Sequence, residues 1–218
     1  LAYGTLGGDT IGALAAGCPV IVKGHPFHAG TSSLLSMVVS RVLNDLKLPR
    51  GIFNHVLDKG FLAGQQLIMD ERIKAGAFTG SMNGGMSLYR LAQQRKSPIP
   101  FFAEMGSLNP VIWLNDVKSV VKNLQDLARS VTEDAGQFCT KPGLMLFPIE
   151  ELDALSTIFR EAMERSESYP MLHPEIYRKY NSRLEEIEQV KHVTRFSNNI
   201  PWNADRAFTQ CTLQEFLA

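Results

Sequence analysis

Two patterns of hydrophobic and polar positions alternate along the first half of the chain. Short apolar runs predict buried strands at 18–23, 52–57 and 73–78. Between them, apolar residues recur every three or four positions, which predicts helices at 11–16, 33–46, 60–69 and 86–94. This order of helices and strands predicts right-handed βαβ units, with a parallel sheet that is covered by helices on both faces.

The pattern changes at 96–100, Lys-Ser-Pro-Ile-Pro, where we expect a domain boundary. Beyond it we expect strands at 101–105, 144–147 and 193–196, and a loop followed by a strand within 106–114. Amphipathic patterns predict helices at 117–132, 150–166 and 174–190. The fold class is therefore α/β: a Rossmann-like parallel sheet flanked by helices in residues 1–99, then an α/β domain with a mainly parallel sheet in residues 100–218.

Composition excludes several classes of function. The 218 residues hold 22 Lys and Arg against 22 Asp and Glu, so no basic field favours nucleic acid or an anionic membrane. No apolar run reaches the roughly 20 residues that a transmembrane helix needs. Three widely spaced cysteines form neither a disulfide framework nor a zinc ligand set, which favours a cytoplasmic setting. His25 and His28 have no carboxylate or cysteine cluster beside them, so we expect no metal.

Cys139 is the first candidate for chemistry. It lies in 136–140, Gly-Gln-Phe-Cys-Thr, and the surrounding loop is rich in Gly, Gln, Thr and Pro rather than in aliphatic residues. A thiol in such a loop is a candidate nucleophile. The alternative is a buried, inert cysteine, the commoner fate of a free thiol, which is the interpretation we give to Cys18 and Cys211.

Three predicted strand ends carry further candidates. Glu104 closes an apolar strand, where partial loss of water favours a general base, although a buried ion pair is the alternative. Lys23 ends the first strand, at the edge where parallel sheets bind ligands, or is simply a solvated lysine. Gly80 and Ser81 lie between a strand and a helix, where backbone N–H groups favour phosphate, although an ordinary glycine turn has the same sequence.

Four motifs together resemble the NAD(P)-dependent aldehyde dehydrogenase superfamily. Their order and spacing match that family from residue 1 to about 147, and more loosely beyond; the motifs occupy 15–23, 78–81, 104–110 and 136–139. Residues 23–32, 98–104 and 136–143 resemble the branch that includes α-ketoglutarate semialdehyde (2,5-dioxovalerate) dehydrogenases. The resemblance makes residues 1–99 part of the NAD(P)-binding domain and residues 100–218 the catalytic domain.

The resemblance also implies roles for single residues. Cys139 would attack an aldehyde carbon, its backbone N–H would form half of an oxyanion hole, and Glu104 would activate the water that releases the acid. Lys23 would bind the adenosine ribose or its 2′-phosphate, Ser81 with Gly80 the pyrophosphate, and Met105 with Gly106 would border the nicotinamide. Glu104 argues against an acylating, CoA-dependent variant, because hydrolysis needs a base.

The cofactor is expected to be NADP or NAD. Many NAD-preferring members place a glutamate three residues after the lysine, where this chain has Pro26. Loss of that carboxylate removes repulsion against a 2′-phosphate and favours NADP. Lys59 and His25 could add positive charge nearby.

We expect the chain to be an internal fragment of a longer enzyme. It begins at Leu1 without methionine, and two motifs of the family, an oxyanion asparagine and a glutamate that holds the nicotinamide ribose, would fall before residue 1 and after residue 218. The expected partners are a small aldehyde substrate and, in the full-length protein, further copies in a homo-dimer or tetramer. A non-catalytic fragment that binds nucleotide or a partner chain is the alternative.

Overall fold

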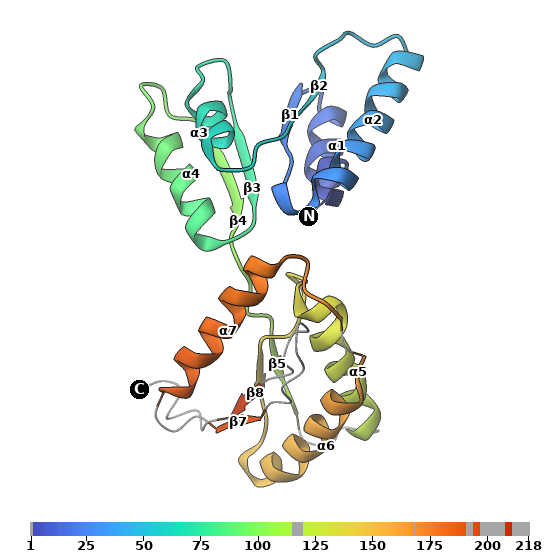
Figure 1. Cartoon of the computed structure of the whole chain (residues 1–218), viewed down its shortest axis with the longest axis vertical. Coiled ribbons are helices and arrows are strands. Elements are labelled where there is room, and N and C mark those ends of the chain that lie inside the picture. Colours follow the sequence, from blue (N-terminus) through green and yellow to red (C-terminus); the bar gives the residue numbers. More distant parts are fainter. Residues whose placement is uncertain (1, 115–119, 168, 191–193, 197–207, 211–218) are drawn as a thin grey trace. The chain divides into compact units, whose positions relative to one another are not determined.

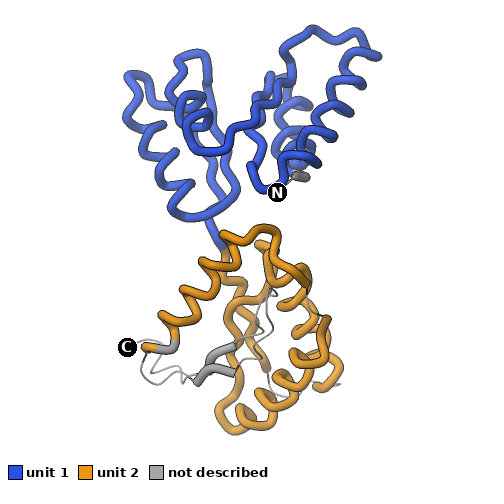
Figure 2. The backbone as a smooth tube through the Cα atoms, in the orientation of Figure 1, with its two compact units in different colours: residues 1–106 blue, residues 107–218 orange. Residues whose placement is uncertain are grey.

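The computed structural model describes residues 2–114, 120–167, 169–190, 194–196 and 208–210. The chain forms two compact units, Leu1–Gly106 and Ser107–Ala218, and each is considered by itself (Figure 2). No helix in the described ranges is both long enough and apolar enough to cross a membrane.

Unit 1 has the alternating order that the sequence predicts. Its elements are η1 (Ala2–Thr5), α1 (Gly8–Ala15), β1 (Val20–Lys23), η2 (Pro26–His28), α2 (Ala29–Asp45), β2 (Phe53–Val56), α3 (Leu62–Met69), β3 (Gly76–Thr79), α4 (Met82–Gln94) and β4 (Phe101–Glu104) (Figure 1). The α/β class is therefore confirmed. The two compact units divide after Gly106, and the domain boundary expected after residue 99 stays a prediction.

The strands of unit 1 pair in two parallel two-stranded sheets. β1 pairs with β2, so that Lys23 lies opposite Val56, and β3 pairs with β4, so that Thr79 lies opposite Glu104. The sequence analysis had placed strand 101–105 in the second domain. Its pairing with β3 is what carries the first unit as far as Gly106.

Unit 2 contains both parallel and antiparallel pairs. Its described elements are β5 (Pro110–Ile112), α5 (Val120–Thr132), η3 (Glu133–Gly136), β6 (Leu144–Leu146), η4 (Ile149–Glu151), α6 (Leu152–Arg165), α7 (Pro174–Glu188), β7 (Thr194–Phe196) and β8 (Phe208–Gln210). β5 runs parallel to β6, and β7 runs antiparallel to β8. The predicted start of α5 at residues 117–119 and residue 193 of the predicted strand 193–196 lie outside the described residues.

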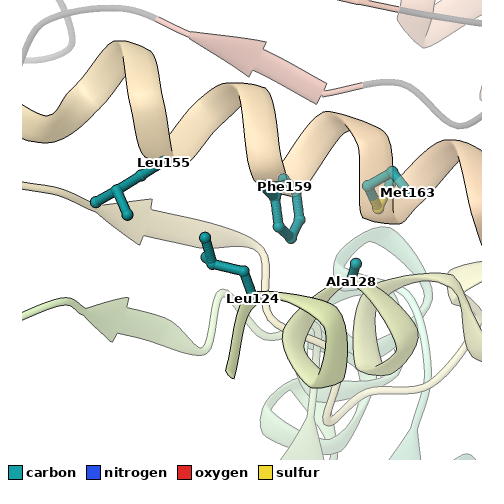
Figure 3. Packing of buried hydrophobic residues seen from close by; sticks show 5 residues of the cluster. All are labelled: Leu124, Ala128, Leu155, Phe159 and Met163. Atoms are coloured by element: carbon teal, nitrogen blue, oxygen red, sulfur yellow. The ribbon is translucent and has the colours of Figure 1, made fainter. Parts of the chain in front are cut away.

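Each unit has its own buried apolar cluster. In unit 1, Ile68 of α3, Ala92 of α4 and Ile99 pack together. In unit 2, the facing sides of α5 and α6 meet around five buried residues, shown in Figure 3: Leu124, Ala128, Leu155, Phe159 and Met163. Three of the helices held by these clusters lead toward candidate site residues: α3 comes before Ser81, α4 before Glu104, and α5 before Cys139.

Candidate active site

Cys139 lies in the loop that joins α5 to β6 in unit 2. The loop begins with η3, where Asp134, Ala135 and Gly136 have positive φ angles of 48°, 57° and 68°. Three left-handed residues in succession turn the chain sharply before the cysteine. The Cys139 side chain is exposed, so the alternative of a buried, inert thiol does not hold for this residue.

Three consecutive residues before β5 are hydrogen-bonded to the Cys139 loop. Asn109 Nδ2 donates to the carbonyl oxygens of Cys139 (2.7 Å) and Lys141 (2.9 Å). Ser107 Oγ also donates to the Cys139 carbonyl, and Gly143 N–H donates to the carbonyl of Leu108 (2.8 Å). The sequence analysis did not select Ser107 or Asn109. The available signal was two short polar residues just before a proline and a strand.

Glu104 lies in unit 1, at the end of β4. Its backbone carbonyl accepts a hydrogen bond from Gly80 N–H (3.0 Å), which joins it to the turn after β3. The side chain is exposed, so neither the partial loss of water nor the buried ion pair considered from the sequence applies. Met105 packs over α4: a Cβ on Gly85 would lie 2.2 Å from its sulfur. Gly106 follows in a left-handed conformation, with φ at 88°.

Ser81 caps the helix that follows β3. Its Oγ accepts a hydrogen bond from Gly84 N–H (3.2 Å), so α4 begins at Met82, before the predicted helix start at residue 86, and includes Gly84 and Gly85. Gly80 and Ser81 therefore lie at the N-terminus of a 13-residue helix, as the sequence analysis expected for a phosphate turn.

A chain of polar side chains lies beneath the turn that follows Lys23. Thr5 Oγ1 and Ser32 Oγ are 2.6 Å apart, and Ser32 Oγ lies 2.8 Å from His55 Nε2. Partial burial lowers the pKa of His55. Gly24 passes directly over this network, because a Cβ there would lie 2.8 Å from His55 Nε2 and 2.9 Å from Ser32 Oγ. The network thus fixes where the chain turns after Lys23, and no sequence pattern indicated it.

The residues expected around the adenosine lie after β1 and β2. His25 Nδ1 accepts from Phe27 N–H (3.2 Å), and Pro26 is the first residue of η2. Lys59 is exposed and follows Asp58, whose carboxylate accepts from Gly60 N–H (3.0 Å) and Ala63 N–H (2.9 Å). These backbone donors hold the pKa of Asp58 below its usual value. The loop after β2 is thereby anchored to the start of α3.

The other cysteines differ from the prediction or lie beyond it. Cys18 is exposed and not buried, because α1 ends at Ala15 and Gly17, with φ at 80°, turns the chain before β1 begins at Val20. Cys211 lies outside the described residues. Among the described side chains, His, Cys, Asp and Glu form no group of three that could hold a metal ion.

The structure has an exposed candidate nucleophile, Cys139, on an α/β fold. Comparison with known sequences identifies the class of protein. The profile of the aldehyde dehydrogenase family matches residues 4–176, and the chain belongs to that family.

Two relatives and one solved structure illustrate the similarity. The chain is 45% identical over 148 residues to the alpha-ketoglutaric semialdehyde dehydrogenase of Acinetobacter baylyi, which covers 67% of this chain and 28% of the relative. It is 37% identical over 199 residues to alpha-ketoglutaric semialdehyde dehydrogenase 2 of Azospirillum brasilense, covering 88% and 38%. The aldehyde dehydrogenase KauB from Pseudomonas aeruginosa superposes with a TM-score of 0.73 at 19% identity, over 85% of this chain and 38% of that one. The chain therefore spans about a third of the length of these relatives.

Proposed function

We propose that Cys139 is the nucleophile of an NAD(P)-dependent aldehyde dehydrogenase that oxidises an oxo-acid semialdehyde such as 2,5-dioxopentanoate. The observation that carries this proposal is the exposed thiol of Cys139 in a loop whose carbonyls are held by Asn109 and Ser107. The family membership supports the reaction class, and the two relatives named for alpha-ketoglutaric semialdehyde support the substrate.

The chemistry follows from the two candidate side chains. The thiolate of Cys139 adds to the aldehyde carbon, and the oxyanion of the resulting thiohemiacetal accepts a hydrogen bond from the Cys139 backbone N–H. NAD(P)+, which Lys23 and the N-terminus of α4 would hold, would supply the acceptor for the hydride whose loss from the former aldehyde carbon leaves a thioester on Cys139. Glu104 takes a proton from water, the hydroxide oxygen bonds to the acyl carbon, and the carbon–sulfur bond breaks to release the carboxylic acid and the thiolate.

The residues of unit 1 fit a dinucleotide cofactor. The capped N-terminus of α4 offers Ser81 and the N–H groups of its first turn to the pyrophosphate. Lys23, at the carboxyl end of β1, supplies a cation for the ribose or its 2′-phosphate. Pro26, which begins η2, contributes no carboxylate that would repel a 2′-phosphate. His25 lies in the loop that follows β1, and Lys59 lies in the loop that follows β2. We therefore place NADP ahead of NAD.

A second candidate is a chain that binds nucleotide or a partner without turnover. The observation that favours it is the share of the relatives' length that this chain covers, 28% and 38%. Where the second candidate binds nucleotide, the two candidates agree on unit 1 and differ in whether Cys139 reacts.

One assay separates the two candidates. The chain is mixed with 2,5-dioxopentanoate and either NADP or NAD, and the absorbance of the reduced cofactor is followed. We expect turnover with a preference for NADP when the same assay is run on a longer protein that contains this chain and the two motifs outside it, lost at least a thousandfold in Cys139→Ser and retained in the matched variant Cys18→Ser. Turnover that survives Cys139→Ser would overturn the thiol mechanism. Cofactor binding without turnover by the unaltered chain would favour the second candidate.

A further inference from the structure

The segment Ser107–Asn109, here called the tether, is bonded to the Cys139 loop through each of its three residues. We propose that Asn109 is a positioning residue, which fixes the peptide of Cys139 and so the direction of its thiol. The chemical meaning of this role rests on the proposed function of Cys139. The contacts themselves lie entirely within unit 2.

The Asn109 amide joins two carbonyls on either side of Thr140. Nδ2 carries two hydrogens, and its two shortest contacts are the Cys139 oxygen at 2.7 Å and the Lys141 oxygen at 2.9 Å. The same nitrogen lies 3.3 Å from Ser107 Oγ, which itself donates to the Cys139 carbonyl. The carbonyl of the proposed nucleophile therefore accepts from two side chains of the tether.

The backbone explains why asparagine suits this position. Asn109 has a φ of 47°, in the left-handed region that Asn, Asp and Gly tolerate best. Of these three residues, only asparagine brings an amide donor. The close approach of the loop also depends on Gly143, since a Cβ there would lie 2.7 Å from the Leu108 carbonyl oxygen. The local sequence thus meets both the conformational and the hydrogen-bonding requirement of the tether.

The Cys139 loop needs such a restraint. Cys139 and Phe138 are exposed, and the loop enters through three left-handed residues. Few apolar contacts are therefore available to order the thiol, and directional hydrogen bonds must do so. Gln137 holds the entry of the loop, because its Nε2 donates to the Asp134 carbonyl (2.8 Å) and its Oε1 accepts from Leu172 N–H (3.0 Å). Asn109 holds its exit.

Two variants of Asn109 test the role without forbidding the backbone conformation. Asn109→Asp keeps the shape and replaces the donor by a carboxylate, whereas Asn109→Gly removes the side chain. Alkylation by iodoacetamide is followed over a pH series, with Cys139 and Cys18 quantified on separate peptides of the same sample. Deuterium uptake is measured across residues 139–143. Asn54→Asp is the matched control, because Asn54 also donates to a backbone carbonyl, that of Gly51 (3.0 Å), in unit 1.

We expect Asn109→Asp to slow Cys139 alkylation near neutral pH by about three- to tenfold relative to Cys18, and to move the rate profile to higher pH. The added carboxylate repels the Cys139 carbonyl and disfavours a thiolate. Asn109→Gly adds no charge, so it should leave the pH profile of Cys139 alkylation unchanged. Both Asn109→Gly and Asn109→Asp should raise deuterium uptake across residues 139–143 several-fold. Ser107→Ala, which removes the second donor, should raise uptake by less.

A purely space-filling Asn109 would give a different result. The isosteric Asn109→Asp would then match the unaltered chain in deuterium uptake across residues 139–143, and that outcome overturns the proposal. The proposal would also be overturned if the control variant Asn54→Asp changed deuterium uptake across residues 139–143 as much as Asn109→Asp does. Unchanged turnover in Cys139→Ser would instead overturn the proposed function and leave the tether standing, so the two failures can be told apart.

Discussion

Arg95 shows how one side chain can close a helix. It is 8% exposed, and its guanidinium donates to the backbone carbonyls of Ile68, Asp70 (2.9 Å) and Ile73 (3.0 Å). The last carbonyls of a helix have no partner within the helix itself. Arg95 therefore satisfies the end of α3 and the segment that leads into β3.

Replacement of Arg95 should be costly for this reason. We expect Arg95→Met to lower the free energy of unfolding by about 2–4 kcal/mol, because one buried and two part-buried carbonyls lose their donor. Arg72→Met is the control: its side chain is 89% exposed and pairs with Asp70, so the change should stay within about 0.5 kcal/mol. Urea unfolding of both variants measures the difference. An Arg95→Met variant as stable as Arg72→Met would show that water replaces the guanidinium.

At the residue scale, the sequence indicates candidate reactive residues but not the residues that hold them in place. Cys139 and Glu104 were recognisable as candidates because each is a reactive residue type within an ordered set of motifs. Asn109 and Arg95 were not, because their partners lie up to 32 and 27 residues away and no periodicity marks such pairs. The exposure of Cys18 was missed because the predicted strand began at residue 18, whereas β1 begins at Val20 and Cys18 lies between β1 and the turn at Gly17.

The pairing of α5 and α6 is the principal packing contact of unit 2. Phe159 is 1% exposed and lies among Leu124, Ala128, Leu155 and Met163 (Figure 3). α5 ends at Thr132, immediately before η3, so this packing positions the start of the Cys139 loop.

Removal of the Phe159 ring should therefore destabilise unit 2. We expect Phe159→Ala to cost about 3–5 kcal/mol, since it combines lost burial with a cavity. Val121→Ala on α5 is the control, because Val121 is 52% exposed, and it should cost less than about 1 kcal/mol. Chemical denaturation followed by the far-ultraviolet signal gives both values. If Phe159→Ala lowered the free energy of unfolding no more than Val121→Ala does, the packing of Phe159 described above would be contradicted.

Most elements were predictable from periodicity, and their ends were not. The seven alternating elements from α1 to α4 follow the order read from the sequence. α4 begins four residues earlier than predicted, at Met82 instead of residue 86, because Ser81 caps it and Gly85 leaves room for Met105. The pairing of the strands could not be predicted either. β4 pairs with β3, from which α4 separates it in the sequence, although the change in composition at 96–100 had suggested a boundary between them.

At the scale of the whole molecule, the family could be predicted from the sequence, whereas the substrate and the choice of cofactor could not. Four motifs in order are specific in a way that none is alone, and the family match over residues 4–176 confirms the resemblance. Glu104 belongs to one unit and Cys139 to the other. The substrate and the choice between NADP and NAD stay predictions, because they depend on contacts with bound molecules, which sequence patterns do not encode.

Protection of Cys139 by an aldehyde tests the central claim most directly, because it requires no turnover. The chain is alkylated with iodoacetamide in the presence and absence of 2,5-dioxopentanoate, and the peptides that contain Cys139 and Cys18 are quantified. Both thiols are exposed, so Cys18 reports any general reaction of aldehyde with thiol. The account predicts that the aldehyde slows alkylation of Cys139 at least fivefold and leaves Cys18 unchanged. Equal slowing at the two cysteines, or none at Cys139, would contradict it.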